Sequence, residues 1–207
     1  MTTIGIPNLP CGNFSSVIKM VARCGGKARL VSDPTELTSC SKIVLAGVGA
    51  FDAGMSGIVD HGWKEALDEV ALQQHKPILG ICLGMQLLCM GSEEGVRPGL
   101  GWINAEVRRF RFEGGERVKV PHMGWNTVRV MKENPLIPNT ETEQRYYFVH
   151  SYHAVCSNIS DVLATTHHGY DLTAAVSRDN IMGVQFHPEK SHRFGMALLK
   201  NFIDLPC

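Results

Sequence analysis

The segment PILGICLGMQ, residues 77–86, joins an apolar run to a helical pattern through a single cysteine, Cys82. The apolar run 77–81 predicts a buried strand, and residues 83–90 predict a helix that stops at Gly91. Glycines two positions before and two positions after Cys82 let the backbone pass closely through a sharp strand-to-helix turn. This is the spacing of a nucleophile elbow with sulfur in place of oxygen. The helix N-terminus would favour a thiolate, and the N–H of Leu83 would face a developing oxyanion.

Outside this segment, the first ninety residues alternate between strand-like and helix-like runs. Such alternation predicts parallel strands joined by right-handed crossovers. The second half consists mainly of strand-like runs between turns. We therefore expect one α/β domain over residues 1–207, with a mostly parallel central sheet flanked by helices and a β-rich antiparallel portion packed on that sheet. The expected strands are 2–6, 28–31, 42–46, 77–81, 102–110, 125–130, 147–150, 162–166 and 181–186. One expected helix begins at residue 13, and three others span 59–70, 83–90 and 193–203.

Composition excludes several classes of protein. Twenty basic residues balance twenty acidic ones, so nothing favours capture of nucleic acid or of an anionic membrane. Seven cysteines without a CxxC pair indicate neither a disulfide framework nor a zinc ribbon. The N-terminus resembles no secretory signal, and no apolar run reaches the length of a membrane span. We expect a cytoplasmic protein that needs no metal and no cofactor.

A thiol nucleophile needs a base, and His187 is the best candidate among nine histidines. It follows the strand-like run 181–186, where Pro188 ends any strand pairing. Glu189 lies close enough to bond one imidazole nitrogen while the other nitrogen faces the thiol. An ordinary buried cysteine and a surface histidine remain possible interpretations at this point, and they are the ones we keep for the remaining cysteines and histidines.

GICLGMQ at 80–86, followed by HPE at 187–189, resembles the class I glutamine amidotransferases. PHMGWN at 121–126, YFVHSY at 147–152 and HPEKS at 187–191 are similar to one branch of that family, the glutaminase subunits of imidazole glycerol phosphate synthase. The resemblance implies that Cys82 attacks the side-chain amide of L-glutamine. It also implies that His187 protonates the departing ammonia and then activates water, while Glu189 holds the imidazole.

Further site residues follow from the same resemblance. The substrate and oxyanion residues would be Gly47, Val48, Gly49, Leu83, Gln86, Ser151 and Tyr152. The family also implies a partner, a (β/α)₈-barrel cyclase that receives the ammonia in a heterodimer. The residues expected near that interface are Pro10, Asn13, Trp125 and Lys190, although Trp125 could instead be a core residue and Lys190 a solvated surface charge.

Two departures from the family pattern keep different functions open. Ala46 stands where relatives usually have proline, and residues 8–13 lack the usual Asp-Tyr-Gly before Gly12. The same chemistry could supply ammonia to an enzyme that aminates or amidinates a surface-polysaccharide sugar. Two further hypotheses are a non-catalytic subunit that keeps the fold, and a peptidase or γ-glutamyl hydrolase with the same Cys–His pair.

Overall fold

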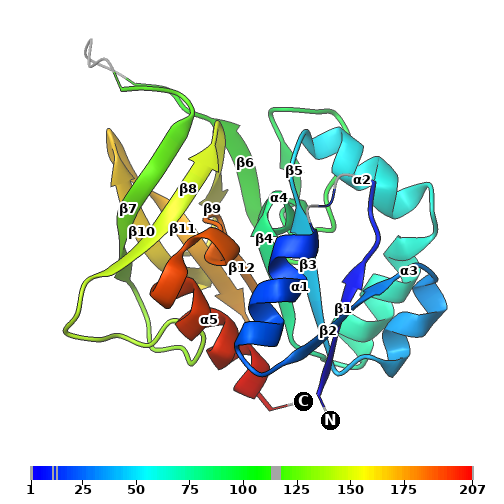
Figure 1. Cartoon of the computed structure of the whole chain (residues 1–207). Coiled ribbons are helices and arrows are strands. Elements are labelled where there is room, and N and C mark those ends of the chain that lie inside the picture. Colours follow the sequence, from blue (N-terminus) through cyan, green and yellow to red (C-terminus); the bar gives the residue numbers. More distant parts are fainter. Residues whose placement is uncertain (1, 11, 13, 113–117, 207) are drawn as a thin grey trace.

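The computed structural model describes residues 2–10, 12, 14–112 and 118–206 (Figure 1). Its strands are β1 Thr3–Pro7, β2 Lys27–Val31, β3 Lys42–Gly47, β4 Ile78–Cys82, β5 Gly91–Ser92, β6 Ala105–Arg109, β7 His122–Val130, β8 Gln144–His150, β9 Tyr152–Cys156, β10 Val162–His168, β11 Tyr170–Arg178 and β12 Ile181–Val184. Its α-helices are α1 Phe14–Arg23, α2 Phe51–Val59, α3 Trp63–Asp68, α4 Leu83–Leu87 and α5 His192–Asp204. Short 3₁₀ or π turns are η1 Pro34–Ser39, η2 Glu69–Gln73, η3 Ile159–Asp161 and η4 Pro188–Lys190. In the described part of the chain, no helix is long and apolar enough to cross a membrane.

The main sheet has nine strands in the order β2-β1-β3-β4-β12-β11-β10-β7-β8. In the first part of this order, β2-β1-β3-β4-β12, neighbouring strands are parallel. In the second part, β12-β11-β10-β7-β8, neighbouring strands are antiparallel. The expected α/β fold with a parallel sheet and an antiparallel portion is confirmed. The antiparallel strands continue the same sheet instead of packing on it as a separate layer. A small second sheet, β5-β6-β9, lies beside α4.

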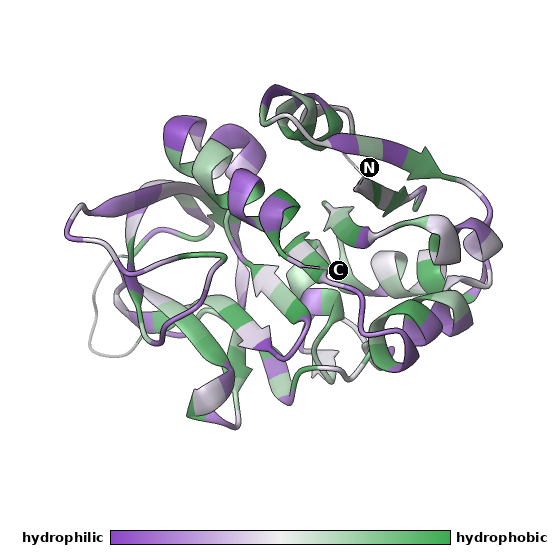
Figure 2. Ribbon diagram, turned by 90° about the horizontal axis from the view of Figure 1, so that it is seen from below, coloured by the Kyte–Doolittle hydropathy of each residue, from purple (hydrophilic) through white to green (hydrophobic). Residues whose placement is uncertain are grey.

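Both faces of the inner parallel strands β1, β3, β4 and β12 are covered, so these strands are mostly apolar without alternation, whereas the edge strand β2 is partly exposed. In β3, Ile43 and Leu45 face the side with α2, α3 and α4, whereas Val44 and Ala46 face the side with α1 and α5. Apolar colouring accordingly follows the central strands, while the helices carry polar residues on their outer sides (Figure 2). The core is thus two apolar layers separated by the sheet.

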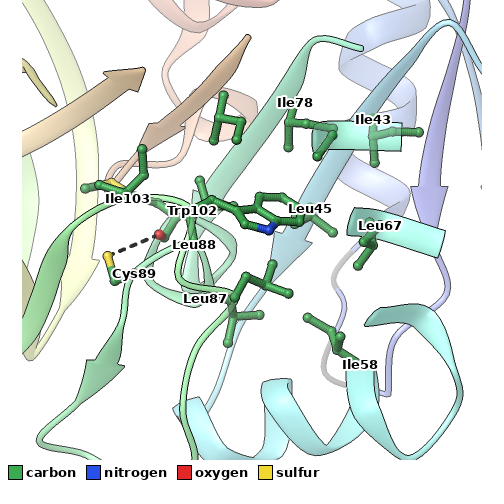
Figure 3. Packing of buried hydrophobic residues seen from close by; sticks show 14 of the residues in the cluster. Ile43, Leu45, Ile58, Leu67, Ile78, Leu87, Leu88, Cys89, Trp102 and Ile103 are labelled. Atoms are coloured by element: carbon green, nitrogen blue, oxygen red, sulfur yellow. Dashed lines mark hydrogen bonds between the residues drawn. The ribbon is translucent and has the colours of Figure 1, made fainter. Parts of the chain in front are cut away.

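Trp102 anchors the layer on the α2–α4 side (Figure 3). Its indole lies among Leu45, Leu87 and Leu88, and it is only 6% exposed. The indole Nε1 donates to Asp68 Oδ1 at 2.9 Å, which satisfies the polar end of a buried ring. The loop before β6 is thereby fixed to α3.

Two glycines make the strand-to-helix turn at β4 possible. A Cβ on Gly84 would lie 1.8 Å from the carbonyl oxygen of Leu45 in β3. A Cβ on Gly80 would lie 2.7 Å from the carbonyl oxygen of Gly84. Because these neighbours are backbone atoms that have no rotamer to change, only glycine fits at either position.

A fully buried lysine ties the C-terminal segment to the sheet. Lys42 Nζ donates to the carbonyl oxygen of Ile203 at 2.8 Å and also to that of Leu205. Carbonyl groups at the end of α5 have no partners within the helix, so the ammonium finds acceptors there that also carry the negative end of the helix dipole. A charge that would otherwise be costly to bury is thus hydrogen-bonded.

Some elements differ from those expected from the sequence. Helix α4 ends at Leu87, three residues earlier than expected, and the expected helix at 59–70 is divided between α3 and η2. Among the strands and α-helices of five or more residues, α2, β9 and β11 were not predicted. The expected strands and the final helix are present with shifted ends.

The Gly84→Ala variant is expected to lose about 3 kcal/mol of unfolding free energy, because the added methyl group must push α4 away from β3. Urea denaturation measures the loss. Gly91→Ala is the matched control, since a Cβ there meets only Glu106 Oε2 at 3.4 Å, an ordinary contact. Equal stability of the two variants would contradict the close-approach argument.

Candidate active site

Cys82 ends β4 with a strained backbone. Its φ of 54° and ψ of −108° lie where residues other than glycine are rarely found. The side chain is 8% exposed and lines a pocket of about 510 Å³. The elbow expected from the sequence is therefore present, with the thiol at the pocket wall.

His187 reaches the same edge of the sheet from β12. Strand β12 runs parallel to β4 with Val184 opposite Ile81, so the two strands end side by side. The backbone N–H of His187 donates to the carbonyl oxygen of Tyr147 at 2.8 Å. Ser191 Oγ donates to the His187 carbonyl oxygen at 2.6 Å and accepts from the N–H of Tyr147 at 3.0 Å. These bonds fix the turn that carries the imidazole.

Glu189 orients the imidazole. Its Oε1 lies 2.7 Å from His187 Nδ1, and the two side chains are 4% and 2% exposed. His187 Nε2 is buried and has no hydrogen-bond partner in the described part of the chain. Burial lowers the pKa of His187, but the neighbouring Cys82 and Glu189 outweigh it and raise this pKa to about 9. The ring therefore holds a proton beside the sulfur at neutral pH.

The pocket collects most of the site residues expected from the sequence. Those that line it are Val48, Gly49, Cys82, Leu83, Gln86, Ser151, Tyr152, His187 and Lys190. Gly47 lies just outside, paired with Cys82 in the sheet and packed against Leu83. Glu189 lies behind the imidazole. Ala46, the departure from the family pattern, is a buried β3 residue opposite Ile81.

Three of the four residues expected near the partner interface are exposed, and the fourth is not described. Trp125 is 40% exposed and stacks on His192 with ring centroids 5.4 Å apart, so it is not a core residue. Pro10 and Lys190 are exposed as well, and Lys190 Nζ lies 5.9 Å from the centre of the Tyr147 ring. Asn13 lies outside the described residues.

Exposed apolar side chains occur on two segments that border the pocket, the loop after β3 and strand β7. Val48 is 40% exposed and Met123 is 61% exposed, in addition to Trp125. Val48 lies in the loop after β3, whereas Met123 and Trp125 come from β7. Exposed apolar residues on neighbouring segments are typical of a surface that contacts another protein.

Gln86 has a fixed orientation within the pocket wall. It is 6% exposed, and its Nε2 donates to the carbonyl oxygen of Tyr152 and to Gln185 Oε1, both at 3.1 Å. No hydrogen bond found within the described ranges uses its Oε1. An acceptor oxygen is therefore left for whatever fills the pocket.

A chain of buried polar groups runs from the pocket to β7. Burial lowers the pKa of His150 to about 3 and that of His122 to about 4, so both rings are neutral at pH 7. His150 Nδ1 lies 2.8 Å from the Tyr152 carbonyl oxygen and must carry its proton. His150 Nε2 then accepts from His122 Nδ1 at 2.9 Å, and His122 Nε2 accepts from Asn126 Nδ2 at 3.0 Å. Each tautomer is thus determined by its neighbour.

Sequence reasoning missed one residue that lines the pocket and another that contacts the thiol. Glu94 lines the pocket, and its Oε2 accepts from the backbone N–H of Phe51 at 2.8 Å, at the start of α2. Gln185 is fully buried, and its Nε2 lies 3.8 Å from Cys82 Sγ. Glu94 lies in a loop without a recognisable motif. Gln185 stands two residues before His187, where strand alternation gave no reason to single it out.

The remaining candidates for chemistry are weaker. A cavity of about 530 Å³ between β7, β8 and β10 is lined by Arg129, His167, Asp171 and several threonines, but cysteine and serine are absent from its described lining. Among the described side chains there is no group of three or more metal-ligating residues. The five cysteines in the described ranges are free, and Cys11 and Cys207 lie outside those ranges. The Cys82 pocket is the candidate active site.

The chain belongs to the class I glutamine amidotransferase family. The model of that family, "Glutamine amidotransferase class-I", matches residues 13–205. The fold agrees: the structure of PurLQS from Thermotoga maritima superposes with a TM-score of 0.70 at 18% identity, covering 98% of this chain and 95% of that one.

Within this family the chain is similar to imidazole glycerol phosphate synthase subunits. It is 46% identical to the subunit HisH 2 of Pseudomonas aeruginosa, over 94% of this chain and 95% of the relative. It is 45% identical to the subunit HisH 2 of Methanococcus maripaludis, over 97% and 98% of the two chains. The similarity extends over almost the whole length.

The buried histidines predict stability that depends on pH in two separate windows. His187 has a folded pKa of about 9 against an ordinary value of 6.5, so its contribution is complete below pH 6.5 and is lost as pH rises towards 9. His122 and His150 have lowered values, so they destabilise the fold as pH falls from 6.5 towards 4 and 3. Urea midpoints measured from pH 4 to 10 should therefore be highest near neutrality.

Variants separate the two windows. His187→Asn should flatten the alkaline decline, and His150→Gln should reduce the acid decline, each by an amount on the order of 1–3 kcal/mol. If either variant follows the wild-type pH profile throughout, the corresponding histidine does not have the assigned protonation state.

Proposed function

We propose that the chain is the glutaminase subunit of an imidazole glycerol phosphate synthase and acts in histidine biosynthesis in the cytoplasm. It hydrolyses L-glutamine to glutamate and ammonia, and the ammonia passes to a (β/α)₈-barrel cyclase subunit. The cyclase then forms imidazole glycerol phosphate and an aminoimidazole carboxamide ribotide. The observation that carries the proposal is the Cys82–His187–Glu189 arrangement in a pocket, on a chain related over almost its full length to synthase subunits.

The chemistry starts with Cys82 as a thiolate, with its proton on His187. The sulfur attacks the side-chain carbonyl carbon of glutamine, and the carbonyl oxygen becomes an oxyanion. The N–H of Leu83 and an N–H of the Gly47–Gly49 loop stabilise this oxyanion. His187 gives its proton to the departing nitrogen, and ammonia leaves a glutamyl thioester.

Water completes the reaction. Neutral His187 takes a proton from water, whose oxygen attacks the thioester carbon. Collapse of the second tetrahedral intermediate breaks the C–S bond and returns the thiolate–imidazolium pair. The sum is glutamine plus water giving glutamate plus ammonia. Glu189 holds His187 in the required tautomer throughout.

Pocket groups complement the zwitterionic end of glutamine. The free Oε1 of Gln86 and the carboxylate of Glu94 are suited to the α-ammonium group. Ser151 and Tyr152 also line the pocket, next to Gln86, whose Nε2 donates to the Tyr152 carbonyl oxygen. A substrate bound by its α-substituents would bring the side-chain amide to Cys82.

The partner would dock over the pocket mouth. Val48, Met123 and Trp125 would supply apolar surface for this contact, and Pro10 and Lys190 are exposed as well. Covering the mouth would keep ammonia away from bulk water, where it becomes ammonium and is no longer nucleophilic. No cofactor is required for either half of the hydrolysis.

Cys82→Ala should lower glutamine-dependent synthase activity by about three orders of magnitude or more, because the covalent step is lost. Activity with free ammonia should remain, since the cyclase does not need the thiol. Coupled assays of the complex with each nitrogen source measure both rates. Cys24→Ala is the control, because the Cys24 thiol donates to the carbonyl oxygen of Met196 and neither residue lines the pocket.

Retention of glutamine-dependent activity in Cys82→Ala would refute the nucleophile assignment. Wild-type protein that is inactive with glutamine in the presence of its partner would indicate a non-catalytic subunit. Preference for γ-glutamyl peptides over glutamine would instead indicate a γ-glutamyl hydrolase.

The acceptor is tested by genetic complementation. The gene should restore growth without histidine to a bacterium that lacks its own glutaminase subunit, and Cys82→Ala should not. Trp125→Ala should reduce rescue, because a central aromatic residue of an interface commonly contributes about 2 kcal/mol or more, roughly a thirtyfold change in affinity. Met131→Ala changes an exposed methionine beyond the end of β7 and serves as the control.

Failure to rescue, together with amination or amidination of a surface-polysaccharide sugar when the matching partner is supplied, would reassign the acceptor. The glutaminase chemistry would then stand, and the histidine pathway would not.

A further inference from the structure

Gln185 is a fully buried amide that no step above uses. It follows the last residue of β12, and its backbone N–H donates to the carbonyl oxygen of Ala174 at 2.9 Å. Because Val184 pairs with Ile81 in parallel register, the next residue along β12 comes beside Cys82. The sheet itself therefore brings this amide to the nucleophile.

Both ends of the Gln185 side chain contact site residues. Nε2 donates to Cys82 Sγ at 3.8 Å, and Oε1 accepts from Gln86 Nε2 at 3.1 Å. A primary amide buried without partners is costly, and an apolar side chain of similar size would fill the same space at no such cost. The contacts thus account for a polar residue at this position.

The orientation of both amides follows from one backbone carbonyl. The Tyr152 oxygen can only accept, so the group of Gln86 that faces it is Nε2, at 3.1 Å. The same Nε2 also faces Gln185, which must present its own Oε1 there. Gln185 Nε2 is then left to point at the sulfur. A flip of either amide would set two acceptors or two donors against each other.

The contacts of the sulfur differ between its two protonation states. In the thiol, Sγ lies 3.9 Å from the Val149 carbonyl oxygen and can donate its proton there. In the thiolate that donation is impossible, whereas the N–H of Gln185 becomes a charge-assisted donor. A hydrogen bond that strengthens with ionisation favours the ionised form.

We propose that Gln185 is a positioning residue of the glutaminase site, which donates an N–H to the Cys82 thiolate and holds Gln86 with its Oε1 towards glutamine. The proposal rests on the proposed function for its substrate, but the contact with the thiol is independent of that substrate. Gln185 thereby links the state of the nucleophile to the binding of the glutamine head group.

Two variants separate the two roles. Gln185→Met removes both contacts at similar volume. Gln185→Glu keeps an acceptor for Gln86 but places an acceptor, not a donor, at the sulfur. Gln144→Met is the matched control. Gln144 lies in β8, away from the thiol, where its side chain donates to the carbonyl oxygen of Pro138 and accepts from the Tyr146 hydroxyl.

The first measurement is alkylation of Cys82 by iodoacetamide across pH, followed by mass spectrometry of the Cys82 peptide. Both Gln185 variants should react about tenfold more slowly at neutral pH, with the midpoint of the profile moved to higher pH. The control should match wild type. Reactivity profiles unchanged in both variants, with wild-type thermal stability, would overturn the contact with the thiol.

The second measurement is steady-state glutamine hydrolysis by the complex with its synthase partner. Gln185→Glu should lower kcat about ten- to hundredfold with KM within about threefold of wild type. Gln185→Met should lower kcat similarly and also raise KM several-fold. Equal effects on KM in the two variants would overturn the role in holding Gln86. Wild-type protein inactive on glutamine, with the alkylation shifts still present, would refute the proposed function and leave the thiol contact standing.

Discussion

The structure depends on how closely α4 approaches β3 behind the nucleophile. Gly84 passes so near the carbonyl oxygen of Leu45 that one methyl group would separate them. This approach lets the chain leave β4 at a sharp angle, which in turn puts Cys82 into a backbone conformation that side chains rarely adopt. The rest of the site is arranged around that position: the end of β12 brings His187 and Gln185 alongside Cys82, and the loop after β3 also lines the pocket.

The candidate active site lies where the main sheet changes from parallel to antiparallel strand pairing. Strands β4 and β12 are the last parallel neighbours, and β11 begins the antiparallel half. Parallel strands release their carboxyl ends at one edge, where loops are free to carry polar groups. The antiparallel half contributes from the side, since the turn between β8 and β9 supplies the pocket wall at Ser151. A nucleophile and a base that are far apart in the chain are neighbours for this topological reason.

Much of this could be predicted from the sequence, because the features concerned are local. The elbow glycines, the apolar strands β1 to β4 and the His-Pro-Glu turn each carry their own signal. Helix α2 was missed because Gly54 and Gly57 weaken a helical pattern, yet Leu87 and Pro10 pack where their side chains would be. Strand β11 was missed because six consecutive residues in it are buried. Both faces of the strand are therefore covered, and its sequence lacks the alternation of apolar and polar residues that marks a half-exposed strand. The roles of Glu94 and Gln185 could not be predicted, because they depend on contacts with residues that are distant in sequence.

The contact between Lys42 and the last turn of α5 has a consequence for synthesis on the ribosome. The ammonium belongs to β3, whereas its acceptors at Ile203 and Leu205 follow it in the chain by 161 and 163 residues. Strand β12 likewise inserts between β4 and β11 only after both have been translated. The sheet therefore cannot form strand by strand from the N-terminus, and the nascent parallel half keeps an open strand edge and an unpaired ammonium until β12 and α5 have been made.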